Sequence, residues 1–575
     1  MLSALRRKGR QVLADPVLRR WMALRLLRRV PGEPPFTPHR PPYLDPGDLA
    51  ADPGPPDAAG FGEIATGPPQ TPLVLPLAGE TVTVAPGAEG ALFARAFADV
   101  ETALSLHRFA WLPVLADRVE PAWVQALWRA WRAAHGTPPA PGDPAPWPWH
   151  PYTAAERAIN LLAHGRRAGL PAPLADTVHV LAAHGPAIAA RLEYFGDHHT
   201  SNHLLNNGRG LHALGVELGL GAWADLGARI LTREAARVFA PSGVLREGSS
   251  HYHLLLTRNL VEAWLLARRH GRAEEPDLAT AARRALAVLP LLSLPGGMPL
   301  VGDISPDMAP DELAGLAAGS GGWTGRLDPD DRAAVDGLRR DAGTVDGAAL
   351  AADGWHRFDH GPWSGLWHAA PAGWSTMPGH GHQDCGGFEL HYRDMPLFRD
   401  LGRGAYGEAG AAAEYRAAGR HNTLMIDDLD PFPANRPYYD DAFRRAVGGP
   451  PPAVAQDGDS LTLTHHGYAR LGGVGAVTRR WHATAGALTL EDRVAGRGRR
   501  TVTRLLHTTL QVARDGDGLV LSGPAGRLRL SADAAPVLSP ATAWTAYGRG
   551  APATAIAWRT PARLPWRGEI RVEVA

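Results

Sequence analysis

The sequence predicts an α+β chain in which a helical part comes first and an all-β part follows. Apolar residues recur at helical spacing in repeated runs between about residues 91 and 340. Beyond residue 354 the pattern changes to alternation of apolar and polar residues, which is typical of half-buried strands. At 575 residues the chain is too long for one ordinary core, so we expect two to four domains.

The first sixty residues are predicted to form a basic, proline-rich arm, 1–60. Residues 1–30 carry many arginines and several leucines but no continuous apolar run like the core of a signal peptide. Residues 31–60 are rich in Pro, Asp and Gly, as linkers and surface arms are. No stretch of the chain is apolar over the length needed to span a bilayer. We therefore expect a cytoplasmic protein, although the sequence leaves a periplasmic location open.

Helical runs follow one another at short intervals through the next part of the chain. Gly and Pro mark the loops between them, as at residues 135–138 and 295–297. Helices joined by short loops pack as antiparallel hairpins, so we predict a helical domain over residues 61–345. The runs are 95–108, 121–134, 153–168, 173–192, 203–219, 222–239, 252–269 and 277–292.

Short alternating segments with turn signals between them fill residues 346–575. Many short strands of this kind predict antiparallel sheets, most simply a large β-sandwich. The segments are 363–367, 388–392, 461–464, 487–490, 502–505, 519–521, 528–530 and 570–574.

Charge and cysteine content narrow the classes of partner. With 59 Lys and Arg against 58 Asp and Glu, the net charge of +1 gives no global attraction to nucleic acid. We therefore expect no nucleic-acid partner. Cys385 is the single cysteine, which excludes an intrachain disulfide.

Two predicted helices begin with side chains that can move protons. Asn202 and His203 open the run 203–219, and Tyr252 and His253 open the run 252–269. Two helix starts in an array of hairpins can face one cleft, where the helix dipoles favour an anion. Amide, imidazole and phenol groups gathered there would form a site for proton transfer beside a bound anion.

A second concentration of polar residues opens the β part. In an extended segment, residues two apart share a face, so His380 and His382 can serve one site, or two sites where the intervening glycine bends the chain. A His-x-His pair with Asp400 and the distant His421 is an acceptable ligand set for Zn²⁺. The simpler alternative is that these histidines form hydrogen bonds within turns and bind no metal.

Aromatic residues concentrate between residues 123 and 152. Most of them are expected in the core, but Trp, Tyr and His at helix ends also form platforms for sugar rings. We take Trp149 as the candidate platform. The concentration comprises Trp123, Trp128, Trp131, Trp147, Trp149, His150 and Tyr152.

Together the motifs resemble the heparinase II/III-like superfamily of polysaccharide lyases, which includes heparin and heparan sulfate lyases and oligoalginate lyases. The likeness extends from about residue 145 to the end of the chain, and its motifs stand in family order. It implies an (α/α) toroid of helical hairpins followed by an antiparallel β-sandwich. The motifs are Asn202-His203-Leu204-Leu205, Glu247 with Tyr252-His253, His380-Gly381-His382-x-Asp384 with Phe388-Glu389-Leu390, and Arg420-His421-Asn422-Thr423.

The resemblance implies a carbon–oxygen lyase that cleaves uronic-acid-containing glycans by β-elimination, giving 4,5-unsaturated products. The substrate would be an acidic poly- or oligosaccharide of glycosaminoglycan or alginate type. By this resemblance Asn202 neutralises the sugar carboxylate, Tyr252 is the acid, and either His203 or Tyr252 is the base. His380 would complete the cleft from the β side.

The same resemblance supplies further residues and a cofactor. Substrate-binding candidates are Arg246, Glu247, His253, Arg416 and Trp149. A structural divalent metal, zinc by its donor set, would be held by His382, Asp400 and His421. The oligomeric state is left open, a homodimer included.

Two rival functions come from other classes. One is a catalytically silent protein of surface-polysaccharide metabolism that binds acidic glycans. The other is a glycoside hydrolase on an (α/α) scaffold, which requires a carboxylate pair such as Glu247 and Asp303. Single residues also have simpler roles: Asn202 can cap its helix, His203 can be a buried histidine and Tyr252 an aromatic anchor.

Overall fold

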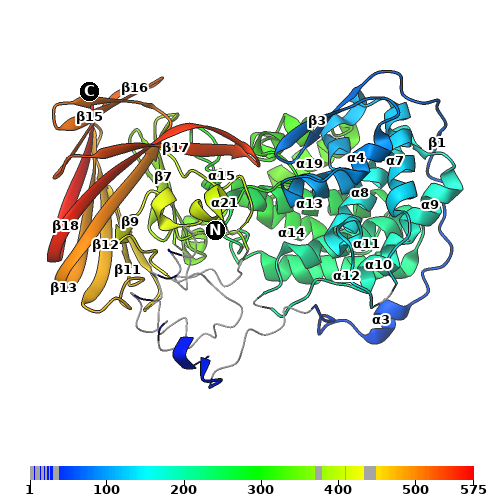
Figure 1. The fold of residues 1–575 in the computed structure, drawn as a ribbon, viewed down its shortest axis with the longest axis horizontal. Helices are drawn as coiled ribbons and strands as arrows, with labels where there is room; N and C mark the ends of the chain where they lie inside the picture. The colour runs from blue at the N-terminus through cyan, green and yellow to red at the C-terminus, as the bar shows by residue number, and fades with distance from the viewer. Residues whose placement is uncertain are drawn as a thin grey trace.

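The chain forms a helical part and a sheet-rich part that lie side by side (Figure 1). The computed structural model describes residues 38–140, 142–197, 199–369, 379–407, 409–432 and 449–575, together with isolated positions before residue 30. Among the described residues, no helix is long and apolar enough to cross a membrane.

The helical part begins with short elements that pack against its edge. β2 and β3 form an antiparallel hairpin, and β1 pairs in parallel with the distant β4. Buried tryptophans on α7 fill the core beneath them. The elements are α3 (Pro46–Ala50), β1 (Glu63–Ile64), β2 (Leu73–Leu77), β3 (Glu80–Val84), α4 (Glu89–Ala94), α5 (Val100–His107), α6 (Trp111–Leu115), α7 (Pro121–His135) and β4 (Leu170–Pro171).

Long helices then alternate with short loops, as the periodicity predicts. α11 packs closely against α12 because Gly215 and Gly227 have no side chain. A side chain at either position would collide with the backbone of the facing helix. The helices are α8 (Pro151–Ala168), α9 (Leu174–Ala182), α10 (His184–Ala189), α11 (Asn202–Glu217), α12 (Gly221–Val238), α13 (Ser250–Arg269), α14 (Glu275–Ala287) and α15 (Leu289–Leu292).

Smaller helices close the helical part. α20 ends at Ala352 and β5 begins at Trp355, near the predicted domain boundary at residue 345. The last helices are α16 (Pro310–Leu313), α17 (Gly315–Ala318), α18 (Gly322–Gly325), α19 (Pro329–Asp341) and α20 (Gly347–Ala352).

Two antiparallel sheets form the second part. The smaller sheet has the strand order β5-β6-β7-β8. Large apolar side chains from this sheet and from the larger one share one core, with Trp367 on β6 packed against Trp481 on β12 at 5.2 Å between ring centroids. The strands of the small sheet are β5 (Trp355–His360), β6 (Trp363–His368), β7 (Gly387–Tyr392) and β8 (Met395–Phe398).

The larger sheet is built around two long antiparallel partners, β13 and β18. Its order is β10-β11-β12-β13-β18-β16-β15-β14, with β9 added on β13 and β17 on β18. Its strands are β9 (Leu424–Ile426), β10 (Ala453–Asp457), β11 (Ser460–His465), β12 (Val474–Ala483), β13 (Ala487–Thr508), β14 (Gln511–Asp515), β15 (Gly518–Gly523), β16 (Gly526–Ala532), β17 (Val537–Ala546) and β18 (Arg549–Val574).

Backbone hydrogen bonds join the two parts beside the starts of α11 and α13. The N–H of Asp303 donates to the carbonyl of His380, and the N–H of His380 donates to the carbonyl of Glu247. The turn between β17 and β18 reaches the helical part, where the Tyr547 hydroxyl donates to Asp99 Oδ2 at 2.7 Å. This junction places loops of the sheet part against helix starts of the helical part.

Candidate active site

Three of the four predicted catalytic side chains meet at this junction. The Asn202 amide nitrogen lies 3.2 Å from His380 Nε2. The Tyr252 ring stacks on the His380 ring, with 3.5 Å between centroids and 12° between planes. Residues separated by up to 178 positions in the sequence therefore lie in one group.

Three helices begin around this group. Tyr152, Asn202 and Tyr252 lie in the first turns of α8, α11 and α13 respectively. The partial positive charge at the start of a helix favours a nearby anion, and three such starts act on the same region. The arrangement suits a negatively charged ligand.

Asn202 is held by a fully buried carboxylate. Glu247 accepts hydrogen bonds from the Asn202 backbone N–H at 2.7 Å and from its amide at 2.9 Å. Asn202 is the first residue of α11, and Ser201 occupies the capping position, so Asn202 does not act as the helix cap. Its amide instead points at Glu247 and His380.

Tyr252 forms a pair with a second tyrosine. Its hydroxyl lies 2.6 Å from the hydroxyl of Tyr406, which also donates to the carbonyl of Ile304. Burial and the charge of Asp307 raise the pKa of Tyr252 well above its usual value, whereas the bond with Tyr406 lowers it. Sequence reasoning missed Tyr406, because it lies in a loop with no periodic pattern and no recognisable motif around it.

His380 is oriented by Asp303. Its Nδ1 lies 3.1 Å from one oxygen of Asp303, whose other oxygen lies 2.7 Å from His382 Nε2. Burial alone would raise the pKa of Asp303, but these histidines and the guanidinium of Arg403 hold it well below its usual value. Asp303 therefore fixes the orientation of the His380 ring, with Nε2 directed toward the Asn202 amide.

His203 points toward a different carboxylate. Its Nδ1 lies 2.6 Å from Glu193 Oε1, and the second Glu193 oxygen accepts from the Asn207 amide at 3.0 Å. Burial acts to lower the pKa of His203, but Glu193 outweighs it, so the pKa is raised. The pKa of Glu193 falls to about 2, because the charge of His203 overcomes the effect of burial. With its side chain 44% exposed, His203 is accessible to a ligand.

A polar network lies behind His203. The Tyr152 ring is 4.7 Å from the His203 ring, and the Tyr152 hydroxyl donates to Asp307 at 2.6 Å. The other oxygen of Asp307 accepts from Arg108 at 2.6 Å. Through Asp307, these contacts hold the loop that follows Asp303 against the helical core.

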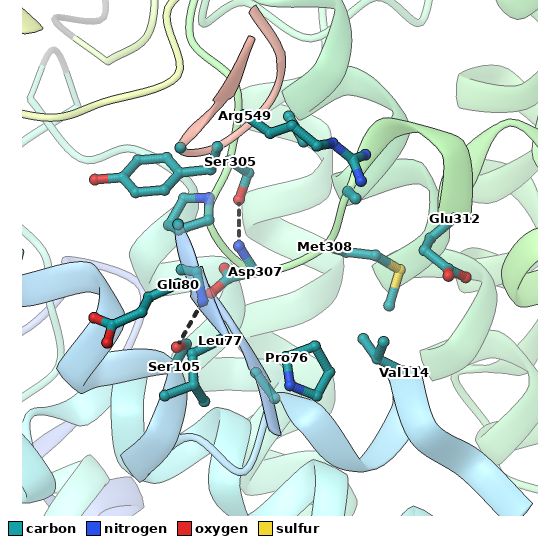
Figure 2. A pocket seen from close by; sticks show the side chains of 18 of the residues that line it. Pro76, Leu77, Glu80, Ser105, Val114, Ser305, Asp307, Met308, Glu312 and Arg549 are labelled. Atoms are coloured by element: carbon teal, nitrogen blue, oxygen red, sulfur yellow. Dashed lines mark hydrogen bonds between the residues drawn. The ribbon is translucent and has the colours of Figure 1, made fainter. Parts of the chain in front are cut away.

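A cavity of about 410 Å³ adjoins this network, as Figure 2 shows. It lies between the β2–β3 hairpin, the loop around Asp307 and the β17–β18 turn. Its charged lining is mainly acidic and comprises Glu80, Asp307, Asp311 and Glu312, with Arg549 as the basic exception. Because these carboxylates repel acidic sugars, the cavity does not suit an acidic glycan.

Comparison with known proteins finds a family match in the C-terminal, sheet-rich part of the chain. Residues 342–565 match the family described as heparinase II/III-like, C-terminal. The resemblance to heparinase II/III-like proteins is confirmed. No curated protein sequence matches the chain.

Solved heparinase structures are similar in fold over most of the chain. The heparan sulfate lyase HepC from Pedobacter heparinus is 16% identical, with a TM-score of 0.51 over 83% of this chain and 78% of that one. Heparinase III is also 16% identical, with a TM-score of 0.61 over 84% of this chain and 79% of that one. Both similarities span the helical part and the sheet-rich part of the chain.

Three predicted substrate-binding residues are buried. Glu247 is fully enclosed and binds Asn202. His253 is also enclosed, and both of its ring nitrogens bind the backbone, at Leu245 and Ala285. Their side chains have no exposed surface for a sugar, so we assign them positioning and structural roles instead.

Trp149 is the third, and it belongs to the core. It is 2% exposed, its ring nitrogen donates to the carbonyl of His135, and the guanidinium of Arg157 lies over its ring. Trp147 is 56% exposed and lies 5.6 Å from His150, which in turn lies 6.3 Å from His203. The exposed aromatic surface near the site is therefore Trp147, two residues from the predicted platform.

The two predicted arginines lie at the edges of the site. Arg246 is exposed, and its Nε donates to the carbonyl of Arg237 at 3.2 Å. Arg416 is half-buried, and its carbonyl accepts from the N–H of Gln383 at 3.0 Å. Arg416 therefore adjoins the loop that carries His380.

The three predicted metal ligands are divided between two hydrogen-bonded pairs. His382 binds Asp303, and His421 Nδ1 lies 2.8 Å from Asp400. The two imidazole rings are 5.1 Å apart, and His382 Nδ1 and His421 Nε2 are both buried without a partner. These two nitrogens suit a cation, but Asp400 bonds to the far side of His421. Among the described residues, no three His, Cys, Asp or Glu side chains are grouped to hold a metal.

Proposed function

We propose that this chain is a polysaccharide lyase that cleaves uronic-acid-containing glycans by β-elimination and releases 4,5-unsaturated products. The observation that carries the proposal is the packed group of Asn202, His380 and Tyr252 at three converging helix starts. The structural similarity to a heparan sulfate lyase supports a glycosaminoglycan as the substrate. We also propose that the helical hairpins close into an (α/α) toroid and that the sheets form a sandwich.

The first chemical requirement is neutralisation of the sugar carboxylate. The proton at C5 becomes acidic enough to remove only when negative charge developing on the carboxylate is stabilised. The Asn202 amide and the His380 imidazole can donate to its oxygens, and the starts of α11 and α13 add partial positive charge. Glu247 and Asp303 hold these two donors in place.

The second requirement is transfer of two protons. A base takes the C5 proton, the electrons form the C4–C5 double bond, and an acid protonates the departing O4. Tyr252 is the acid, with its hydroxyl hydrogen-bonded to Tyr406. His203 is the base when the two protons lie on opposite faces of the sugar, and Tyr252 serves both roles when they lie on one face.

An exposed ring extends the site beyond the reacting sugar. We assign the platform for a neighbouring sugar to Trp147, because its indole is exposed and adjoins His150 beside His203. Arg416 is placed to hold a flanking carboxylate or sulfate, since it adjoins the loop of His380.

A glycoside hydrolase is less compatible with the carboxylates. A hydrolase needs one protonated and one ionised carboxyl group on either side of the sugar bond. Glu247 is fully buried against Asn202, and the pKa of Asp303 is held well below its usual value. Glu247 therefore has no exposed surface for the sugar bond, and Asp303 does not supply the protonated carboxyl group.

A structural divalent cation remains part of the proposal, with zinc favoured by nitrogen donors. His382 and His421 would hold it through their unpartnered nitrogens, and Asp400 would orient His421 from behind. The cation would fasten the loop of His380 to the sheet part. Elemental analysis of purified protein, with the melting temperature before and after chelation, tests this directly.

Ultraviolet absorbance tests the reaction itself. Incubation with heparan sulfate, chondroitin sulfate, hyaluronan and alginate should raise the absorbance with one of them, because elimination creates a conjugated double bond. Tyr252→Phe should bind the same glycan and give no increase. Binding by the wild-type protein with no absorbance change for any glycan would favour the silent binding protein and contradict the lyase.

A further inference from the structure

The outer face of the larger sheet carries a strip of arginines that the proposed reaction does not use. β13 and β18 run side by side in the sheet-rich part (Figure 1). Alternate residues on β18 face solvent, and four of them are Arg559, Arg563, Arg567 and Arg571. At about 3.3 Å per residue these four extend over roughly 40 Å.

The register places arginine directly opposite arginine at two positions. Arg493 on β13 pairs with Arg567 on β18, and Arg499 pairs with Arg563. Side chains directly opposite one another in antiparallel strands are close neighbours, and like charges there destabilise the sheet. Two such pairs on one face would be stabilised by an anion bound between them.

Carboxylates offset only part of this charge. Glu491 binds both Arg493 and Arg567, and these two arginine side chains remain 59% and 61% exposed. Within the part of the chain that the structure describes, the guanidinium groups of Arg497, Arg499 and Arg563 form no ion pair or hydrogen bond. The opposed pair Arg499 and Arg563 therefore has no protein anion to bind.

The strip is a local departure from the nearly neutral chain. The outward residues of β13 between 491 and 499 and of β18 between 559 and 573 include seven arginines and three glutamates. The whole chain, in contrast, carries a net charge of +1. The arginines are Arg493, Arg497, Arg499, Arg559, Arg563, Arg567 and Arg571, and the glutamates are Glu491, Glu569 and Glu573.

We propose that this strip is a second binding site, outside the catalytic group, for a long acidic glycan. The guanidinium groups of Arg499 and Arg563 would clamp a carboxylate or sulfate, which they match in bidentate geometry. The proposal rests on the proposed function for its choice of polymer. It assigns the strip to holding long chains, and not to the chemistry.

The chemistry of the face favours a glycan over other polyanions. Single-stranded nucleic acids bind through aromatic side chains that stack on bases, but the outward residues here are Arg, Glu, Thr, Pro and Ala. Insertion into a membrane surface needs large apolar side chains, and the outward residues of these strands include none. A chain with regularly spaced carboxylates or sulfates needs only the arginines.

The strand also connects the strip with the catalytic junction. β18 begins at Arg549, next to Tyr547, which contacts Asp99 of the helical part and accepts from the N–H of Tyr406 at 3.2 Å. Arg559 lies ten residues farther along, roughly 33 Å away on an extended strand. Only a long glycan can reach both sites, so the strip should act on polymers and not on short oligosaccharides.

Binding to a full-length, inactive protein tests the strip. In a Tyr252→Phe background, Arg499→Gln with Arg563→Gln should weaken binding of full-length heparan sulfate or alginate by about tenfold at low salt. Binding of a tetrasaccharide should not change. The control pair, Arg129→Gln with Arg233→Gln, removes the same charge from exposed positions of the helical part and should leave polymer binding unchanged.

Each other outcome overturns the proposal. Unchanged polymer binding by the strip variant, or an equal loss in the control pair, shows that these two arginines form no site. An equal loss for duplex DNA of similar charge assigns the strip to polyanions in general. A wild-type protein that eliminates no glycan would end the lyase proposal, while the binding measurement would still decide the strip.

Discussion

The two sides of the catalytic group are built in different ways. On the helical side, Asn202, His203 and Tyr252 lie in the first turns of long helices, so the backbone fixes their directions. On the sheet side, His380 and Tyr406 lie in loops, where regular hydrogen bonding cannot orient them. The His380 side chain is oriented instead by a buried charge, because the Asp303 carboxylate binds His380, His382 and Arg403.

The difference separates chemical residues from positioning residues. On the helical side, Glu193 raises the pKa of His203, so the carboxylate tunes proton transfer. On the sheet side, Asp303 is shared among three cationic or neutral nitrogen groups and serves as an anchor. Substitutions on the helical side should therefore change rate and pH dependence, whereas those at the anchor should also change stability.

The largest expected effect is on the helical side. Tyr252→Phe removes the proton donor and keeps the ring that stacks on His380. We expect kcat to fall about 10³-fold, within the range for loss of an acid–base group, with the melting temperature nearly unchanged. Ultraviolet assays measure the rate. Tyr43→Phe removes a partly buried hydroxyl, bound to Glu234, and should keep full activity.

The anchor on the sheet side should show a coupled loss. Asp303→Asn leaves Arg403 without its buried partner, so we expect a loss of about 3–5 kcal/mol in unfolding free energy and about 10²-fold in kcat. Asp492→Asn breaks another buried pair, with Arg479 at 2.8 Å, in the sheet part. It should cost similar stability without the loss of kcat. Equal kcat losses in both variants would reduce the role of Asp303 to folding.

The helical side was predictable because its signals are local. The period of apolar residues predicts α11 and α13, and the polar residues at their starts indicate a site. Family motifs then joined His380 to them. The contacts between these residues, which are distant in the sequence, depend on tertiary packing. The periodicity of apolar residues does not predict that packing.

The sheet side was less predictable because its contacts are nonlocal. Tyr406 and Arg403 carry no motif, and Asp303 was considered only as a hydrolase carboxylate. Burial was the second difficulty: Trp147 and Trp149 stand two residues apart, and the sequence did not distinguish the exposed ring from the buried one. The same applies to His253, whose ring nitrogens are both taken by backbone groups.

The carboxylate behind His203 gives a pH test of the helical side. A base must be neutral, so kcat/KM should rise with pH through the raised pKa of His203. Glu193→Gln removes the carboxylate while burial continues to lower the pKa, so this limb should move to lower pH. The plateau should also fall, because a weaker base accepts the proton less readily. Profiles between about pH 5 and pH 8 measure both changes.

A matched histidine pair provides the control. Glu274 binds His212 at 2.7 Å, and its pKa is likewise lowered to about 2 because hydrogen bonding to His212 overcomes burial. Glu274→Gln should leave the pH profile unchanged. A profile that does not move in Glu193→Gln would transfer the role of base to Tyr252 and place both proton transfers on one face of the sugar.

The smallest expected effect on turnover concerns the two tryptophans. Trp147→Ala removes an exposed ring beside His150, so KM for oligosaccharides should rise several-fold while kcat and stability stay nearly constant. Trp149→Ala opens a cavity in the core and should cost about 3–5 kcal/mol of unfolding free energy. Trp147→Phe should recover much of the lost affinity, since it restores an aromatic face. An unchanged KM in Trp147→Ala would limit the glycan site to the polar groups at the helix starts and the loops that face them.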